Sequence, residues 1–254
     1  MEFRAFDELR DGDGLRMFLV AGTPSPWGQA AKAMIEYKGI ECAYGAWIPG
    51  EANEELAAWS GANSGPIVAY DDEKPIDKWN DILFLLERIA PAPSLIPEDA
   101  MERVLMFGFA HEICGELGLG WNRRLSMFAP LLESGQAPDG VKHMGEKYLY
   151  NQQDAEAASQ RAADTMNALT KQLESQKAKG SDYFIGDKLT ALDFYWCAFS
   201  FLVEIPSWEK IPLAEDWRPL FVHDDHVVHG AHSAVLKAHR DRIFEAHFKN
   251  PMEF

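Results

Sequence analysis

Short hydrophobic runs alternate with short helical patterns over the first part of the chain, up to about residue 90. Residues 15–21 read as a buried strand, and residues 28–38 read as a helix that Gly39 ends. The same pattern predicts strands at residues 40–47, 66–70 and 74–76, and helices at residues 54–59 and 81–89. The predicted order is βαβαββα, an α/β layer with a four-stranded mixed sheet.

A proline-rich segment separates this layer from a second half with a different pattern. The segment APAPSLIPED, residues 90–99, contains three prolines and cannot continue a helix. Beyond it, apolar residues at helical spacing predict helices at residues 98–117, 154–179 and 190–203. We therefore predict an α/β domain at residues 15–90 and an all-helical domain at residues 98–254.

Composition narrows the class of protein and the kinds of partner. The 254 residues carry a formal net charge of −16, which argues against nucleic acid or anionic membranes as partners. Cys42, Cys114 and Cys197 are far apart and outside any C-x-x-C pair, which argues against a disulfide framework or a zinc knuckle. The N-terminus does not resemble a signal peptide, and no run of 18 apolar residues occurs. We expect a cytoplasmic protein.

The stretch GTPSPWGQAAKAM, residues 22–34, places Ser25 between two prolines just before a predicted helix. Unpaired backbone N–H groups and the positive end of the helix dipole meet at such a position. One interpretation is that Ser25 only caps the helix. The other is that Ser25 lies at a site for a sulfur or oxygen anion.

The most specific stretch is YFIGDKLTALDFYWC, residues 183–197. Thr190 and Asp193 have the spacing of a capping box, in which each side chain bonds the backbone N–H of the other residue. An aromatic-Ile-Gly-Asp-x-Leu-Thr-x-x-Asp run that opens a buried helix, about a hundred residues after a βαβαββα unit, resembles the glutathione transferase superfamily. The resemblance covers residues 15–201 and includes a Ser-type site like that of bacterial cytosolic members.

This resemblance implies a thioredoxin-like N-terminal domain, an all-helical C-terminal domain and a homodimer. It implies that Ser25 activates the thiol of glutathione, the co-substrate, because a hydroxyl that donates to sulfur favours the thiolate. Pro66 matches the family's cis-proline. The residues implied in glutathione binding are Trp27, Trp47, Gly65, Pro66, Ile67, Asn80 and Asp81. The residues implied in the acceptor pocket are Phe107, His111, Trp121 and Arg123, which suit a small hydrophobic electrophile in conjugation, elimination or isomerisation.

Three positions depart from the family's pattern. Asn80-Asp81 stands where Glu or Gln followed by Ser or Thr is common, and Ser64-Gly65 replaces a basic and a β-branched residue. The segment GAWIPGEAN has no Lys or Arg for the glycyl carboxylate, and only Trp47 and Asn53 could substitute. A second interpretation is therefore a non-catalytic binding or regulatory protein on the same fold.

A histidine cluster near the C-terminus raises the question of a metal site. His223, His226, His229 and His232 recur every third residue. A strict spacing of three drifts around an α-helix, and Gly230 interrupts the pattern. We expect a solvated helix here and no metal.

Overall fold

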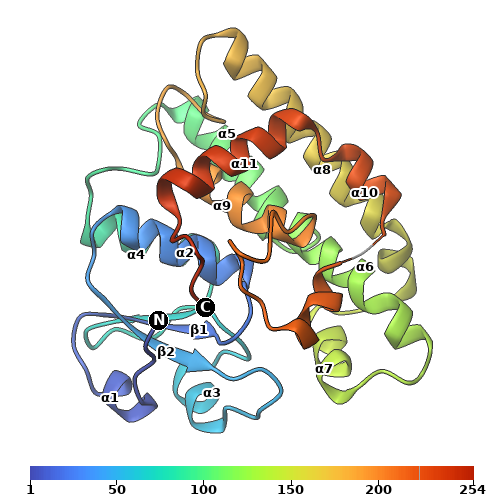
Figure 1. The fold of residues 1–254 in the computed structure, drawn as a ribbon. Helices are drawn as coiled ribbons and strands as arrows, with labels where there is room; N and C mark the ends of the chain where they lie inside the picture. The colour runs from blue at the N-terminus through green and yellow to red at the C-terminus, as the bar shows by residue number, and fades with distance from the viewer. Residues whose placement is uncertain (223) are drawn as a thin grey trace.

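The computed structural model describes residues 1–222 and 224–254, which form an N-terminal α/β domain and a C-terminal helical domain (Figure 1). The elements of the first domain are α1 (Phe6–Arg10), β1 (Leu15–Val20), α2 (Pro26–Tyr37), β2 (Cys42–Trp47), α3 (Glu54–Ser60), β3 (Ile67–Tyr70) and α4 (Trp79–Ile89). The pattern of apolar runs thus located the strands to within one or two residues. It did not predict α1, which precedes residue 15 and packs against β2.

The sheet has three strands in the order β2-β1-β3, not the four that the sequence predicts. β1 runs parallel to β2, with Leu15 opposite Cys42, and antiparallel to β3, with Phe18 opposite Ile67. The expected fourth strand is reduced to an isolated bridge between Val68 and Ile76. Pro75 has no N–H to donate, so the segment around it cannot extend the ladder.

Helices cover both faces of the sheet (Figure 1). α2 and α4 lie on one face, where they pack with Met17 and Leu19. α1 and α3 lie on the other face, around Phe18, Trp47 and Ile67. Alternation along β1 therefore divides its side chains between two apolar layers.

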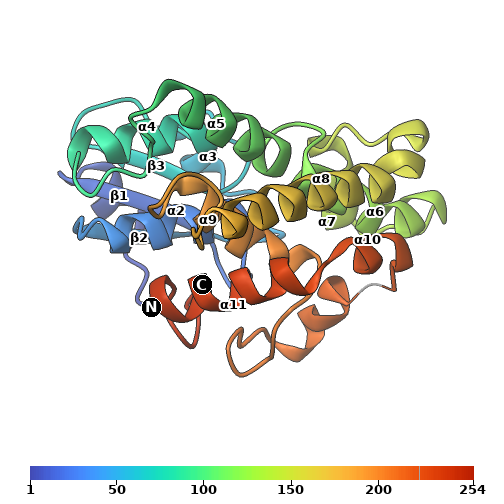
Figure 2. The same ribbon diagram turned by 90° about the horizontal axis from the view of Figure 1, so that it is seen from above.

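Among the residues that the structure describes, the second domain contains helices and connecting loops and no strand. Its helices are α5 (Ala100–Cys114), α6 (Leu119–Glu133), α7 (Asp139–Lys147), α8 (Gln152–Ala178), α9 (Ala191–Phe199), α10 (His226–Ala231) and α11 (Ala234–His247). Two 3₁₀ segments, Ser200–Leu202 and Glu215–Phe221, connect α9 to α10. Figure 2 shows α5, α8 and α11 around α9, as seen from above.

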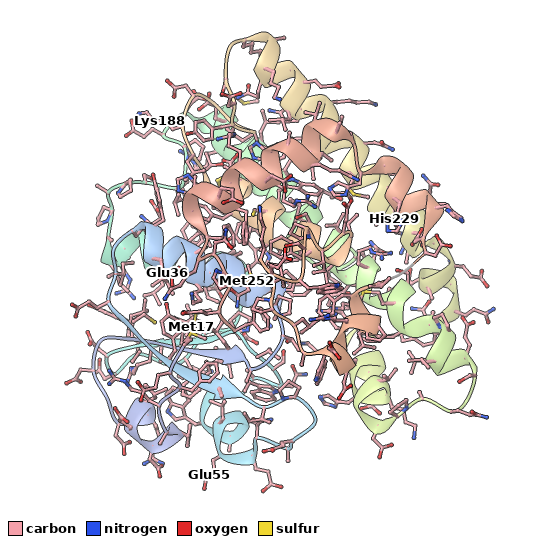
Figure 3. The ribbon with its side chains drawn as sticks, in the orientation of Figure 1. Met17, Glu36, Glu55, Lys188, His229 and Met252 are labelled. Carbon is pink, nitrogen blue, oxygen red and sulfur yellow. The ribbon has the colours of Figure 1, made fainter. Side chains whose placement is uncertain are left out.

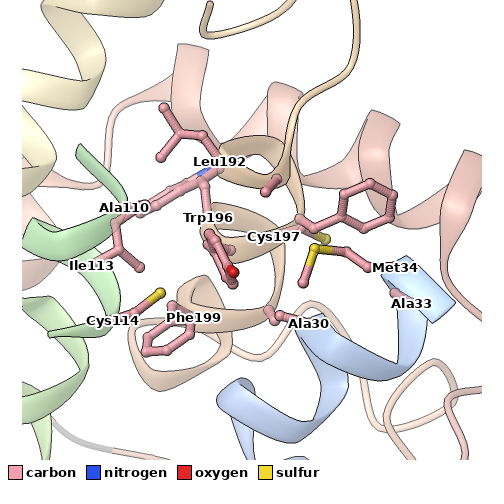
Figure 4. Close-up of a cluster of buried hydrophobic side chains, with 14 of the residues drawn as sticks. Ala30, Ala33, Met34, Ala110, Ile113, Cys114, Leu192, Trp196, Cys197 and Phe199 are labelled. Atoms are coloured by element: carbon pink, nitrogen blue, oxygen red, sulfur yellow. The ribbon is translucent and has the colours of Figure 1, made fainter. Parts of the chain in front are cut away.

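α9 lies at the centre of the molecule and joins the two domains. All nine of its residues are buried. Figure 4 shows Leu192, Trp196 and Phe199 between α5 and α2, where they meet Ala110, Ile113 and Met34. The two domains therefore share one continuous hydrophobic core.

The predicted capping box at the start of α9 is present. The Asp193 carboxylate accepts the backbone N–H of Thr190 at 2.8 Å and the Thr190 hydroxyl at 3.0 Å. It also accepts the N–H of Phe184 at 3.2 Å and lies 3.0 Å from Nε2 of His239. One buried carboxylate thus holds the start of α9, the preceding loop and α11 together.

The C-terminal segment returns to the first domain. Met252 is buried and lies near α2, as Figure 3 shows. The Gln29 side chain on α2 donates to the carbonyl of Glu253 at 3.2 Å. This segment thereby supports the helix that begins after Ser25.

Candidate active site

Ser25 occupies the N-cap position of α2 but caps the helix only through its backbone. Its carbonyl accepts the N–H of Gln29 at 2.9 Å, whereas its hydroxyl makes no capping hydrogen bond within the described structure. Pro26 is the first helical residue and has no N–H to satisfy. The half-buried Ser25 hydroxyl therefore lies at the positive end of a helix dipole and is not used by the helix itself.

The loop before β3 lies next to this helix end. The Gly65–Pro66 peptide bond is cis, as the sequence predicts. A Cβ placed on Gly28 would lie 2.8 Å from Cδ2 of Leu19 and 4.0 Å from Cβ of Pro66, so the absence of a side chain lets α2 approach the loop. The Gly65–Pro66 loop therefore lies against the first turn of α2, three residues after Ser25.

Close approach to β1 explains why Gly65 replaces a β-branched residue. A Cβ on Gly65 would lie 3.0 Å from the Phe18 carbonyl oxygen and 3.2 Å from the Val20 nitrogen. Backbone atoms cannot move aside as the end of a flexible side chain can. Gly65 therefore lets the loop lie directly on the strand.

Trp27 points toward the helical domain. Its indole N–H donates to the carbonyl of Cys114 at 2.9 Å, and its ring lies edge-on to Phe199 at 4.7 Å and tilted against Tyr148 at 6.3 Å. The Trp27 side chain therefore fixes the site helix to the other domain.

Two further predicted glutathione-binding residues have buried side chains. Trp47 and Ile67 belong to the apolar layer under α1 and α3. Asn53 is occupied within its own loop, where its side chain bonds the backbone of Ile48 and Glu51. These three residues can offer a ligand mainly their backbone.

α4 begins two residues earlier than the sequence predicts. Trp79 is its first residue and Lys78 its N-cap, so Asp81 does not begin the helix. Asn80 and the exposed Asp81 lie in the first turn. Both side chains are thus placed at a helix N-terminus, which favours an anion, although the Asp81 carboxylate opposes one.

The four predicted acceptor residues are not brought together. The Phe107 ring stacks on Phe84 at 5.4 Å, beside α4. His111 is exposed and lines a surface cavity of about 490 Å³ together with Arg161 and Asp164. Trp121 lies edge-on to Tyr148 at 5.0 Å. Trp121 and Trp27 of the site helix share a ring contact with Tyr148.

Arg123 is turned into the helical core. Its guanidinium forms an ion pair with Asp225 at 2.8 Å and donates to the Leu202 carbonyl at 3.0 Å. Ser126 accepts a further hydrogen bond at 3.1 Å. These contacts make Arg123 a link between α6 and the segment before α10.

Sequence reasoning missed Lys147 and Tyr148, which lie with Arg124 where the two domains meet. Lys147 Nζ contacts the hydroxyl of Ser64, the residue before Gly65. Burial, reinforced by the nearby Arg124, lowers the pKa of Lys147 to about 8. Burial also lowers the pKa of Arg124 and raises that of Tyr148. The Arg123-Arg124 pair was visible in the sequence, but the proximity of Lys147 depends on tertiary packing.

Over residues 1–222 and 224–254, no group of three or more His, Cys, Asp or Glu side chains could hold a metal. Of the histidine cluster, His226 is exposed near Asp224 and His232 is buried against Glu204, while His223 lies outside the described residues. No helix in the described part of the chain is long and apolar enough to cross a membrane.

Comparisons with known proteins agree with this architecture. Residues 139–213 match the family model "Glutathione S-transferase, C-terminal domain". The sequence matches no curated protein significantly.

Solved structures of low sequence identity share the fold. A glutathione S-transferase from Methylobacterium radiotolerans, in complex with glutathione sulfonate, is 15% identical with a TM-score of 0.61, covering 91% of each chain. One from Xanthobacter autotrophicus is 14% identical with a TM-score of 0.58, covering 93% of this chain and 96% of its own. A family member from Pseudomonas fluorescens with two glutathione bound is 14% identical with a TM-score of 0.53, covering 90% and 92%. Residues 139–213 thus match the C-terminal domain of glutathione S-transferases, and the chain as a whole shares the fold of the solved members.

Proposed function

We propose that the protein is a glutathione transferase in which the Ser25 hydroxyl donates a hydrogen bond to the glutathione sulfur. The observation that carries the proposal is the position of this hydroxyl, which lies at the positive end of α2 and is not used by the helix, while the cis-Pro66 loop lies against the same first turn. A donor and a helix dipole at one point both favour a thiolate over a thiol. The match of residues 139–213 to a glutathione S-transferase C-terminal domain, and the fold shared with a glutathione S-transferase solved with glutathione sulfonate, support glutathione as the ligand.

In the proposed complex the tripeptide lies along the N-terminal domain. The backbone of Gly65 and Ile67 flanks the cysteinyl part, Asn80 and Asp81 face the γ-glutamyl end, and Trp47 lies toward the glycyl end. The thiol proton passes to solvent, and the sulfur electron pair forms a bond to the electrophilic carbon of a small hydrophobic acceptor. In conjugation the leaving group departs with its own electron pair. We also propose that the protein acts in the cytoplasm and that its role is the detoxification of such electrophiles.

Replacement of Ser25 with Ala tests this role. One hydrogen bond to a charged sulfur is worth about 1.5–3 kcal/mol, so Ser25→Ala should lower kcat about 10- to 100-fold while glutathione affinity changes little. The ultraviolet absorbance of the bound thiolate should titrate at higher pH in the variant. Thr23→Ala, which removes a neighbouring hydroxyl, is the matched control. If Ser25→Ala keeps full turnover and only the melting temperature falls, Ser25 is a structural residue.

The second candidate is a non-catalytic binding or regulatory protein. It is favoured by the exposed Asp81 carboxylate, which would repel the glutamyl carboxylate of the ligand. Calorimetry with free glutathione separates the two functions. Absence of both binding and turnover in the wild-type protein would establish the second.

We also propose that the protein is a homodimer. Four apolar side chains of α4 and α5 form an exposed patch, here called the α4–α5 face: Phe84, Met101, Val104 and Leu105. Met101 and Val104 are 68% and 64% exposed. On α5 the three residues follow helical spacing, so they share one side of the helix. Contiguous exposed apolar surface of this kind is typical of a protein interface.

A further inference from the structure

Two adjacent arginines on α6 have opposite environments. Arg123 has a carboxylate partner in Asp225, as described above. Arg124 has no ion pair with a carboxylate within the described residues, although its Nε is fully buried and finds no hydrogen-bond acceptor. Its side chain bonds the Tyr148 hydroxyl, and its guanidinium lies 5.8 Å from the centroid of the Phe221 ring. A buried cation without an anion is costly, so such a group is retained where a ligand supplies the missing charge.

A second cation without a carboxylate partner lies close to Arg124. Lys147, the last residue of α7, contacts the Ser64 hydroxyl and lies 5.5 Å from the Tyr148 ring centroid. It makes no ion pair with a carboxylate in the part of the chain that the structure describes. Ser64 directly precedes Gly65 and cis-Pro66, so Lys147 reaches from the helical domain to the edge of the proposed thiol site.

The charges around Lys147 do not cancel. Arg124, Lys78 and Asp77 act on it electrostatically, and Asp77 already pairs with Lys78 at 3.2 Å. The local balance is therefore positive, in a chain whose formal net charge is −16. Aromatic rings border the same place, because Trp27 and Trp121 both contact Tyr148.

We propose that Arg124 and Lys147, with Ser64, bind the carboxylate of the electrophile, so that the acceptor is a small aromatic acid. This inference rests on the function proposed above. Both cations belong to the helical domain, whereas the residues proposed to hold the tripeptide belong to the N-terminal domain. The anion therefore comes from the acceptor, and the rings of Trp27, Trp121 and Tyr148 accommodate its aromatic body.

The proposal predicts the direction of a pH effect. With a pKa of about 8, Lys147 is largely protonated at neutral pH. Arg124, Lys78 and the paired Asp77 face it from the neighbouring elements, and Tyr148 lies beside it. A bound carboxylate favours the protonated amine, so affinity for the anion should decrease as pH rises through 8.

Two chloronitroarenes that differ in charge test the proposal. Turnover of 4-chloro-3,5-dinitrobenzoate and of neutral 1-chloro-2,4-dinitrobenzene, each divided by its uncatalysed rate with glutathione, gives a preference ratio for the anion. Arg124→Gln and Lys147→Gln should each lower this ratio about 10- to 100-fold, the effect of a charge-assisted hydrogen bond. Lys142→Gln removes an exposed cation from α7, the helix that carries Lys147, and should leave the ratio unchanged. Arg124→Lys, which keeps the charge, should retain part of the preference.

Calorimetry with unreactive 3,5-dinitrobenzoate and 3,5-dinitrobenzamide gives a readout that does not depend on turnover. The wild-type protein should bind the acid more tightly than the amide, and Arg124→Gln should abolish the difference. Equal preference ratios in wild type and variants, or equal affinities for acid and amide in wild type, would overturn the proposal. It would also be overturned if the variants weakened glutathione binding instead, because the cluster would then hold a carboxylate of the tripeptide. Failure of the proposed function has a different signature, no glutathione binding and no turnover of either arene.

Discussion

Asp193 shows how much one buried carboxylate can hold together. Two backbone N–H groups and one hydroxyl donate to it, and His239 lies against it. Asp193→Ala leaves these groups without their partner, so we expect unfolding free energy to fall by about 3 kcal/mol, more than the 1–2 kcal/mol of a cap alone. Thr190→Ala, which removes a single hydroxyl, should lower the unfolding free energy by only about 1 kcal/mol. Urea titrations of the wild type and both variants measure these losses. Equal losses in the two variants would mean that Asp193 acts as a helix cap only.

At the scale of elements, α6, α9 and α2 meet at Gly120. A Cβ there would lie 2.4 Å from Cε1 of Phe199 and 3.0 Å from the Trp27 ring. Gly120→Ala should therefore force these rings apart and lower unfolding free energy by about 1–3 kcal/mol. Gly140→Ala on α7 is the matched control, because nothing lies within 4 Å of its Cβ and Ala favours a helix, so stability should stay equal or rise by up to about 1 kcal/mol. A Gly120→Ala protein as stable as the control would show that the junction is loosely packed.

At the scale of the whole molecule, the α4–α5 face predicts the oligomeric state. The wild-type protein should sediment at twice the chain mass of 28.6 kDa. Phe84→Asp places a charge in the α4–α5 face and should shift the protein to monomer at micromolar concentration, because an unpaired charge is costly in an apolar interface. Leu149→Asp changes a side chain that is 64% exposed, compared with 52% for Phe84, but lies outside the face, and it should leave the dimer intact. A monomeric wild-type protein would refute the proposed interface.

The sequence predicted the elements whose signals are local. Apolar runs located β1 and β2, and the Thr190–Asp193 spacing predicted the start of α9. The start of α4 was misplaced because Asp81 is the better capping residue, whereas the structure uses Lys78. The fourth strand was predicted wrongly. The residue pattern around Pro75 does not show how many backbone hydrogen bonds this short segment makes to its neighbour, and only an isolated bridge forms.

For the candidate site, local sequence patterns identified residues of the N-terminal domain but not the pair of cations in the helical domain. Ser25 was singled out by the local Pro-Ser-Pro pattern before a helix, whereas the cis bond at Pro66 was implied by the family resemblance and is confirmed. Arg124 and Lys147 lie 23 positions apart and carry no shared motif. Arg124 and Lys147 come together because α6 and α7 pack near the loop at Ser64. This proximity depends on tertiary packing, so it could not be predicted from the sequence pattern.

The continuous core that runs from Met17 through Met34 to Trp196 has a consequence for how the protein can diversify. Neither domain can open without exposing apolar surface of the other, so the two should melt as one cooperative unit. A hybrid that combined the first 90 residues with the helical half of a relative would mismatch the contacts of α2 with α9. For the function proposed above, new acceptor specificities would therefore arise by substitutions inside the helical half, since exchange of whole domains would break the core on which both domains depend.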